Sequence, residues 1–228
     1  ETDTAMRRLI IERSAIRNNM AAIKERAQGA ALYGVVSGQG GGVGAVRLAR
    51  LLRDAGVTRF GVNSVEEAQL LRESGFETEE ILMLRSTVDR EELEQLVDLS
   101  VVCTVSSVDT GLALNAVAEN RSTVAEAHIQ VDTGLGFGGF LISEPEKILL
   151  AYRSLPNVAL SGIYTQLHAV TGKSQEVDGQ LGQFQQVLEA IHQAGFETGT
   201  VHAAGSFALM HFDDARLDAV RAGSAILG

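Results

Sequence analysis

The chain has 228 residues, a formal net charge of −10 and 45% apolar residues, with few aromatic side chains and no tryptophan. This length fits one large domain, and the negative charge argues against nucleic acid or an anionic membrane as a partner. No apolar run reaches the roughly 18 residues that span a bilayer. The polar, acidic amino end predicts no signal peptide, and the lone Cys103 fits a reducing, cytoplasmic compartment.

The chain opens with a segment, 1–6, that we expect to be frayed. A short strand at 8–12 and a helix at 14–28 form an N-terminal unit over 7–28, ahead of a barrel over 31–228. Apolar runs of strand length then recur between helical patterns. The expected strands are 32–36, 59–63, 80–84, 101–105, 126–131, 158–165, 199–204 and 219–222. Eight strands alternating with helices predict a single-domain α/β fold, the (β/α)₈ TIM barrel, with an open doubly wound sheet as the alternative.

The stretch 31–44, ALYGVVSGQGGGVG, reads as a buried strand that runs into a glycine-rich turn and then into a helix. Five glycines in this turn allow positive φ and a close approach of the backbone to a ligand. The turn contains a loose G-x-G pattern, which also occurs in dinucleotide-binding sheets. The next predicted strand ends in Asn63 instead of an acidic residue, so the dinucleotide interpretation is disfavoured.

In a barrel the chemistry lies where strands end and helices begin. The predicted strand ends are polar, whereas the strands behind them are apolar, which favours a pocket at the C-terminal face. We expect Ser64 and Ser107 to be helix N-caps, and Ser64 with Glu67 to form a capping box. The other polar tips include Ser37, Gln39, Asn63, Arg85, Ser106, Asp132, Thr133, Gln166, His168, Ser206, Arg221 and Ser224. His128 and His202 are expected to begin strands, at the opposite end.

Several motifs resemble, in order, those of the N-terminal barrel domain of the alanine racemase family. They are the glycine-rich stretch 31–44 and the segments Phe60–Ala68, Val131–Gly136, Gly162–Thr165, His202–Ser206 and Val220–Gly223. The resemblance spans Arg8 to Gly228. It implies a fold type III barrel in which a lysine at the end of the first strand holds pyridoxal phosphate (PLP) as an imine for amino-acid racemisation, an isomerase activity.

The departures from the family pattern fall on functional positions. Where the resemblance implies the PLP lysine, the phosphate-binding tyrosine, an arginine, a histidine and an asparagine, this sequence has Ser37, Gly41, Phe137, Gln166 and Gly205. The phosphate-contacting Ser206, Gly223 and Ser224 are present, as is Arg221, which corresponds to the partner of the pyridine nitrogen. The family's second, β-rich domain and its catalytic tyrosine are absent, so we expect a monomer. Concentration of the changes at the pocket favours a redesigned, engineered site, with natural retasking as the alternative.

Three hypotheses follow for the pocket. The first is an inactive or binding barrel that holds a small molecule or anion, such as phosphate or non-covalent PLP, with no covalently bound cofactor. The second is a serine hydrolase with Ser37 as nucleophile, His168 as base and Asp132 as the group that orients it. The third is a PLP-dependent isomerase that uses another lysine, of which Lys173 is the best placed. No His, Asp or Glu pair has ligand spacing, so we expect no metal site.

Overall fold

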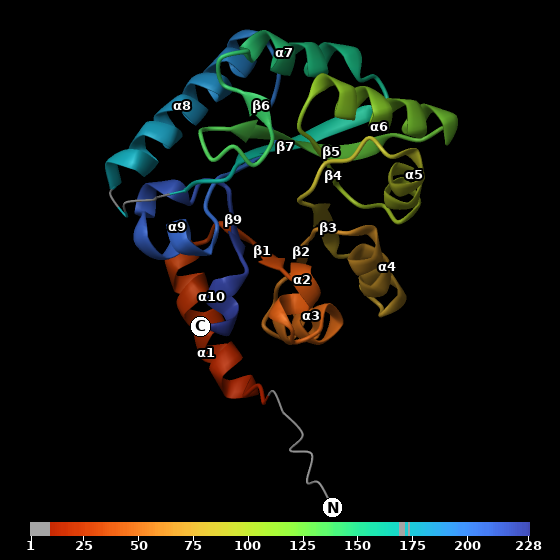
Figure 1. The fold of residues 1–228 in the computed structure, drawn as a ribbon. Coiled ribbons are helices and arrows are strands. Elements are labelled where there is room, and N and C mark those ends of the chain that lie inside the picture. Colours follow the sequence, from red (N-terminus) through yellow and green to blue (C-terminus); the bar gives the residue numbers. More distant parts are fainter. Residues whose placement is uncertain (1–9, 169–171, 173) are drawn as a thin grey trace, which may run out of the picture.

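The computed structural model describes residues 10–168, 172 and 174–228 (Figure 1). Within them, eight parallel strands form a ring in the order β3-β2-β1-β9-β8-β7-β5-β4. The ring is closed between its ends by the pair Leu82 and Val102, because the Val102 N–H donates to the Ile81 carbonyl and the Met83 N–H to the Val102 carbonyl. The (β/α)₈ prediction is confirmed. No helix among these residues is long and apolar enough to cross a membrane.

The barrel strands match the eight that the sequence predicts. They are β1 (Ala31–Val35), β2 (Arg59–Val62), β3 (Glu80–Met83), β4 (Cys103–Val105), β5 (Ala125–Asp132), β7 (Val158–Thr165), β8 (Thr200–His202) and β9 (Ala219–Ala222). A short strand that the sequence did not predict, β6 (Phe140–Leu141), pairs with the end of β5. The strand expected at 8–12 is not found over residues 10–12, which are irregular, and its first two residues lie outside the described residues.

The helices surround the ring of strands (Figure 1). They are α1 (Arg13–Ala27), α2 (Ser37–Gly41), α3 (Ala45–Asp54), α4 (Val65–Glu73), α5 (Arg90–Asp98), α6 (Val108–Asn120), α7 (Pro145–Ser154), α8 (Ser174–Gln193), α9 (Ser206–His211) and α10 (Ser224–Leu227), with a 3₁₀ turn η1 (Asp213–Ala215). The first and last helices lie side by side, and the Asn19 side chain donates to the Ile226 carbonyl at 2.9 Å.

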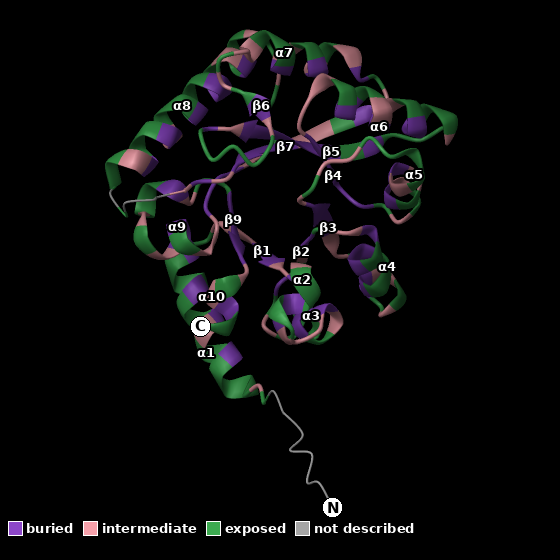
Figure 2. Cartoon of the chain, viewed as in Figure 1, coloured by how far each residue is buried: buried purple, intermediate pink, exposed green. Residues whose placement is uncertain are grey.

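The main hydrophobic core lies between the strands and the helices (Figure 2). In α3 the stripe Ala45, Leu48, Ala49 and Leu52 is buried because these positions share one face of the helix. Each fully buried leucine contributes about 1.5–3 kcal/mol relative to an exposed one. Cys103 belongs to this core, and burial raises the pKa of its thiol to about 12, so it behaves as a small apolar residue.

The predicted helix starts are confirmed at Ser64 and Ser107, whose hydroxyls accept the backbone N–H groups of Glu67 and Thr110. The capping box predicted at Ser64 is only half formed. The Glu67 carboxylate does not return to the cap residue; it accepts the N–H groups of Gln39 at 3.1 Å and Asn63 at 3.0 Å. Helix α4 is therefore tied to the turns that follow β1 and β2.

Candidate functional site

The glycine-rich turn after β1 forms the first wall of the candidate site. All five of its glycines have positive φ, as predicted, and Gln39 shares this conformation at φ 55°. Residues 38–41 therefore make one left-handed turn, which costs a non-glycine residue such as Gln39 about 1–2 kcal/mol. The nearly buried Glu67 carboxylate offsets part of this cost, because it accepts the Gln39 N–H.

A pocket of about 450 Å³ opens beside this turn. Ser37 lines it from the end of β1, and Gly223 and Ser224 line it from the end of β9. The other lining residues are Val35, Gly40, Gly41, Leu48, Leu227 and Gly228. None of these residues carries a charged side chain, so a ligand would meet hydroxyl groups, backbone N–H groups and apolar surface.

Ser206, at the start of α9, follows β8 and contacts the part of this wall that follows β9. Its hydroxyl oxygen accepts the N–H of Gly223 at 2.9 Å and the N–H of Ala225 at 3.2 Å. The contact brings together the loops after β8 and β9. The hydroxyl oxygen already satisfies two of the backbone donors that an anion would use.

Arg221, on β9, lies at the centre of a buried polar network. Its Nη2 donates to the carbonyl oxygens of Thr165 and Ala203 and to Gln166 Oε1, and its Nη1 donates to His202 Nδ1. The guanidinium also sits 5.0 Å from the centre of the Tyr164 ring. Burial lowers the pKa of Arg221 to about 10, so it remains a cation near neutral pH.

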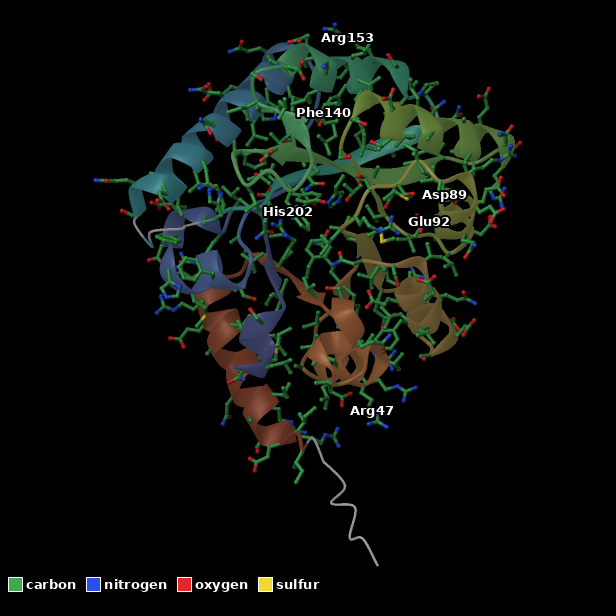
Figure 3. The ribbon with its side chains drawn as sticks, in the orientation of Figure 1. Arg47, Asp89, Glu92, Phe140, Arg153 and His202 are labelled. Carbon is green, nitrogen blue, oxygen red and sulfur yellow. The ribbon has the colours of Figure 1, made fainter. Side chains whose placement is uncertain are left out.

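The expectation that His128 and His202 begin strands at the far end of the barrel is wrong. His202, labelled in Figure 3, is the last residue of β8. His128 lies in the middle of β5. His128 Nδ1 and His202 Nε2 are 2.9 Å apart. The His202 ring is stacked between the rings of Tyr33 and Tyr164, with centroid distances of 5.4 and 4.9 Å. Both histidines face the interior of the barrel because the strand register turns them inwards.

The hydrogen bonds determine which ring nitrogens carry protons. A guanidinium only donates, so His202 Nδ1 is an acceptor and neutral His202 carries its proton on Nε2. That proton is donated to His128 Nδ1, and neutral His128 then carries its own proton on Nε2. Burial, followed by the charge of Arg221, lowers the pKa of His128 to about 4 and that of His202 well below 6.5. Both rings are neutral at neutral pH.

The proposed nucleophile, base and orienting group are not joined by hydrogen bonds within the described residues. Asp132 Oδ1 accepts the N–H groups of Gly134 and Gly136 in its own loop. The His168 backbone is held by Gln180, and its buried Nδ1 has no hydrogen-bond partner. Neither His168 nor Asp132 lines the pocket at Ser37.

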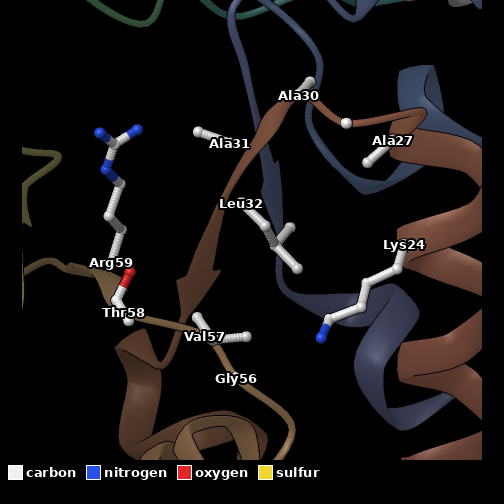
Figure 4. Close-up of a pocket in the computed structure, with 10 residues that line it drawn as sticks. Lys24, Ala27, Ala30, Ala31, Leu32, Gly56, Val57, Thr58 and Arg59 are labelled. Atoms are coloured by element: carbon white, nitrogen blue, oxygen red, sulfur yellow. The ribbon is translucent and has the colours of Figure 1, made fainter.

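The described lysines lie away from this pocket. Lys24, on α1, borders a different cavity, together with residues from the starts of β1 and β2, and donates to the Ala55 carbonyl (Figure 4). Lys147, on α7, pairs with Glu144 at 2.7 Å. The third lysine considered above, Lys173, lies outside the described residues. The described residues also contain no group of three or more His, Cys, Asp or Glu side chains that could hold a metal ion.

Sequence reasoning missed three parts of this arrangement: the buried pair of histidines, the role of Glu67 and the bond from Gln166 to Arg221. No clear signal was available for His128, because the same strand also contains the polar residues Glu126 and Gln130. For Glu67 the local signal indicated a capping box with Ser64, and nothing local indicated its bond to Gln39, which lies 28 residues earlier. For Gln166 no local signal existed, because Arg221 lies on a different strand.

The family model described as "Alanine racemase, N-terminal domain" matches residues 11–228. The chain is 31% identical to the alanine racemase of Desulforamulus reducens over 223 residues, and 32% identical to that of Carboxydothermus hydrogenoformans over 216 residues. These alignments cover 96% and 93% of this chain, but only 59% and 57% of the two relatives. The chain therefore spans less than three fifths of the relatives' length.

Solved structures agree with this match. The alanine racemase of Clostridium difficile 630 in complex with cycloserine superposes with a TM-score of 0.88 at 26% identity, covering 94% of this chain and 59% of that one. The racemase of Bacillus anthracis with bound L-Ala-P gives 0.84 at 28%, covering 94% and 55%. The racemase of Bartonella henselae with covalently bound pyridoxal phosphate gives 0.82 at 24%, covering 95% and 59%, a likeness of fold alone. The sequence match and the shared barrel together show that this chain belongs to the alanine racemase family, which it matches over the N-terminal domain.

Proposed function

We propose that this barrel does not racemise amino acids through covalently held PLP, and that its C-terminal face binds a small anion such as phosphate, or PLP without a covalent bond. The observation that carries the proposal is the residue at the end of β1. Ser37 stands there, in the wall of the pocket, and a hydroxyl group cannot form an imine. A serine is also a poor base near neutral pH, so it cannot replace a lysine in proton transfer.

The described residues do not fit PLP held as in the Bartonella henselae racemase. Covalent attachment requires an amine at the pocket, and the described lysines are held elsewhere, Lys24 by the Ala55 carbonyl and Lys147 by Glu144. The donors of Arg221 Nη2 are already taken by protein oxygens. A covalent cofactor would therefore lack both an anchor and this charged partner.

The retained groups support binding of an anion. Ser206 brings its hydroxyl to one side of the mouth, and the O–H group, whose oxygen accepts two backbone N–H groups, can still donate to a phosphate oxygen. Arg221 adds a fixed positive charge two residues before Gly223. The lining residues contribute no opposing carboxylate side chain.

Covalent attachment is tested by incubating the protein with PLP, reducing with borohydride and mapping any adduct by mass spectrometry. We expect no adduct on a pocket residue. A stoichiometric, site-specific adduct on Lys173 or another lysine would overturn the proposal. The variant Ser37→Lys serves as the positive control, because it places an amine at the end of β1.

Anion binding is tested by calorimetric titration with inorganic phosphate. The variant Ser37→Asp places a negative charge in the pocket wall, and Ser37→Asn is its neutral control of nearly the same size. Repulsion between two charges near a protein surface is about 1–4 kcal/mol at 4 Å, so we expect Ser37→Asp to bind phosphate about tenfold more weakly or worse. We expect Ser37→Asn to bind like the parent chain. Equal affinities for the two variants would place the anion elsewhere.

A further inference from the structure

Gln166 follows β7 and occupies the corner between Arg221 and the loop that carries Ser206. Its Oε1 accepts a hydrogen bond from Arg221 Nη2 at 2.9 Å. Its amide nitrogen lies against Gly205, the residue just before Ser206. Gln166 is partly exposed, whereas Arg221 is buried.

The Gln166 amide in its observed position leaves no room for a side chain at Gly205. A Cβ added at Gly205 would come within 2.9 Å of Gln166 Nε2, closer than side-chain atoms tolerate. The backbone at Gly205 has φ −82° and ψ −175°, an extended conformation that any residue adopts. A larger residue at this position would therefore push the Gln166 amide aside, and the glycine leaves the space that the amide fills.

Gln166 is also the one displaceable acceptor among the recorded partners of Arg221. The other partners of the guanidinium are backbone carbonyl oxygens at Thr165 and Ala203 and the buried ring of His202. Backbone carbonyls and a stacked ring cannot move aside without disturbing the strands. A ligand that approaches Arg221 from the mouth must therefore compete with the Gln166 carbonyl oxygen.

We propose that Gln166 is the specificity-determining residue of this site. It supplies Arg221 with an internal acceptor and so restricts the mouth to compact anions of the size of phosphate. Phosphate esters with a second acceptor directed at Arg221, of which PLP is an example, bind more weakly because they must displace the amide. This inference rests on the proposed function, since it concerns the ligand of the same site.

The first test compares two probes, inorganic phosphate and PLP, by equilibrium dialysis of the full chain and of Gln166→Ala. Removing the amide frees a guanidinium donor, and hydrogen bonds to charged groups are stronger than those between neutral groups. We expect the affinity for PLP to rise at least tenfold and the affinity for phosphate to change less than twofold. Gln185→Ala removes an exposed glutamine on α8 and should change neither affinity.

The second test needs no ligand. In the parent chain Gly205→Ala crowds the amide and should lower the urea midpoint, whereas in the Gln166→Ala background the same substitution should have no effect. A double-mutant cycle measures this coupling. If the parent chain does not bind phosphate, the proposed anion site is refuted, whatever the outcome for Gln166. Unchanged PLP affinity in Gln166→Ala, or additive effects in the cycle, would refute the role of Gln166.

Discussion

Acidification is expected to destabilise the barrel through the buried pair His128 and His202. The two neutral rings share a hydrogen bond inside the barrel, and His202 Nδ1 accepts a hydrogen bond from the cation Arg221. A proton added to either ring places a second positive charge beside Arg221 in a buried site. Folding is therefore favoured while both rings remain neutral.

The size of the effect follows from the pKa of His128, which is 6.5 when the ring is unperturbed and about 4 in the folded chain. Between these two values the unfolded chain binds a proton that the folded chain does not bind. The free energy of unfolding therefore has its full value above about pH 6.5 and falls as the pH decreases towards 4. At pH 5 the loss from His128 alone is about 2 kcal/mol, at about 1.36 kcal/mol for each pH unit. His202 acts in the same direction, because its pKa is also lowered.

The assay is urea unfolding at a series of pH values between 7.5 and 5. The variant His128→Gln keeps a carbonyl oxygen that accepts from His202 and cannot be protonated in this range. We expect its unfolding free energy to fall by about 2 kcal/mol less than that of the parent chain over this interval. His192→Gln, on the exposed face of α8, is the control and should leave the pH profile unchanged. Identical profiles for the parent chain and His128→Gln would refute the reasoning.

Two further pairs of substitutions probe the scaffold. At Gly199 φ is +65° and an added Cβ would lie 2.1 Å from a backbone carbonyl oxygen, so Gly199→Ala should lower the free energy of unfolding by roughly 3 kcal/mol or more in a urea titration. Gly179 lies in open space on α8, so Gly179→Ala should raise the free energy of unfolding by about 0.5–1 kcal/mol. Similar urea midpoints for the two variants would contradict this reasoning. In Glu67→Gln the single amide oxygen can accept only one of the two backbone N–H groups that Glu67 holds, so the free energy of unfolding should fall by about 1.5–3 kcal/mol. The control Glu66→Gln, at an exposed position, should change the free energy of unfolding little. Equal losses in the two variants would show that the bond to the glycine turn is unimportant.

Much of the fold was predictable because its signals are local. Apolar runs of strand length, separated by helical stripes, gave all eight barrel strands, and the glycines after β1 indicated the positive φ values that the turn adopts. Ser64 and Ser107 were recognisable as caps because a cap and its partner N–H lie within three residues. The two-residue strand β6 was missed because it is too short to have a pattern of its own.

The composition of the site was only partly predictable. Ser37, Ser206 and Gly223 could be assigned to one face of the barrel because each follows a strand. The proposed link from Ser37 to His168 and Asp132 rested on the same rule, yet residues on one face of a barrel need not touch. In this ring β1 has β2 and β9 as neighbours, so the residues that follow β5 and β7 are not next to Ser37.

By itself, the sequence determined the alternation of strands and helices, the left-handed turn and the absence of lysine at the end of β1. Only the tertiary structure decided that His128, His202 and Arg221 meet inside the barrel, that Glu67 holds the turn after β1 and that Gln166 fills the space beside Gly205. The reason is physical. Backbone preferences and helix caps act between neighbours in the chain, whereas these contacts join residues from different strands whose register is set by closing the ring.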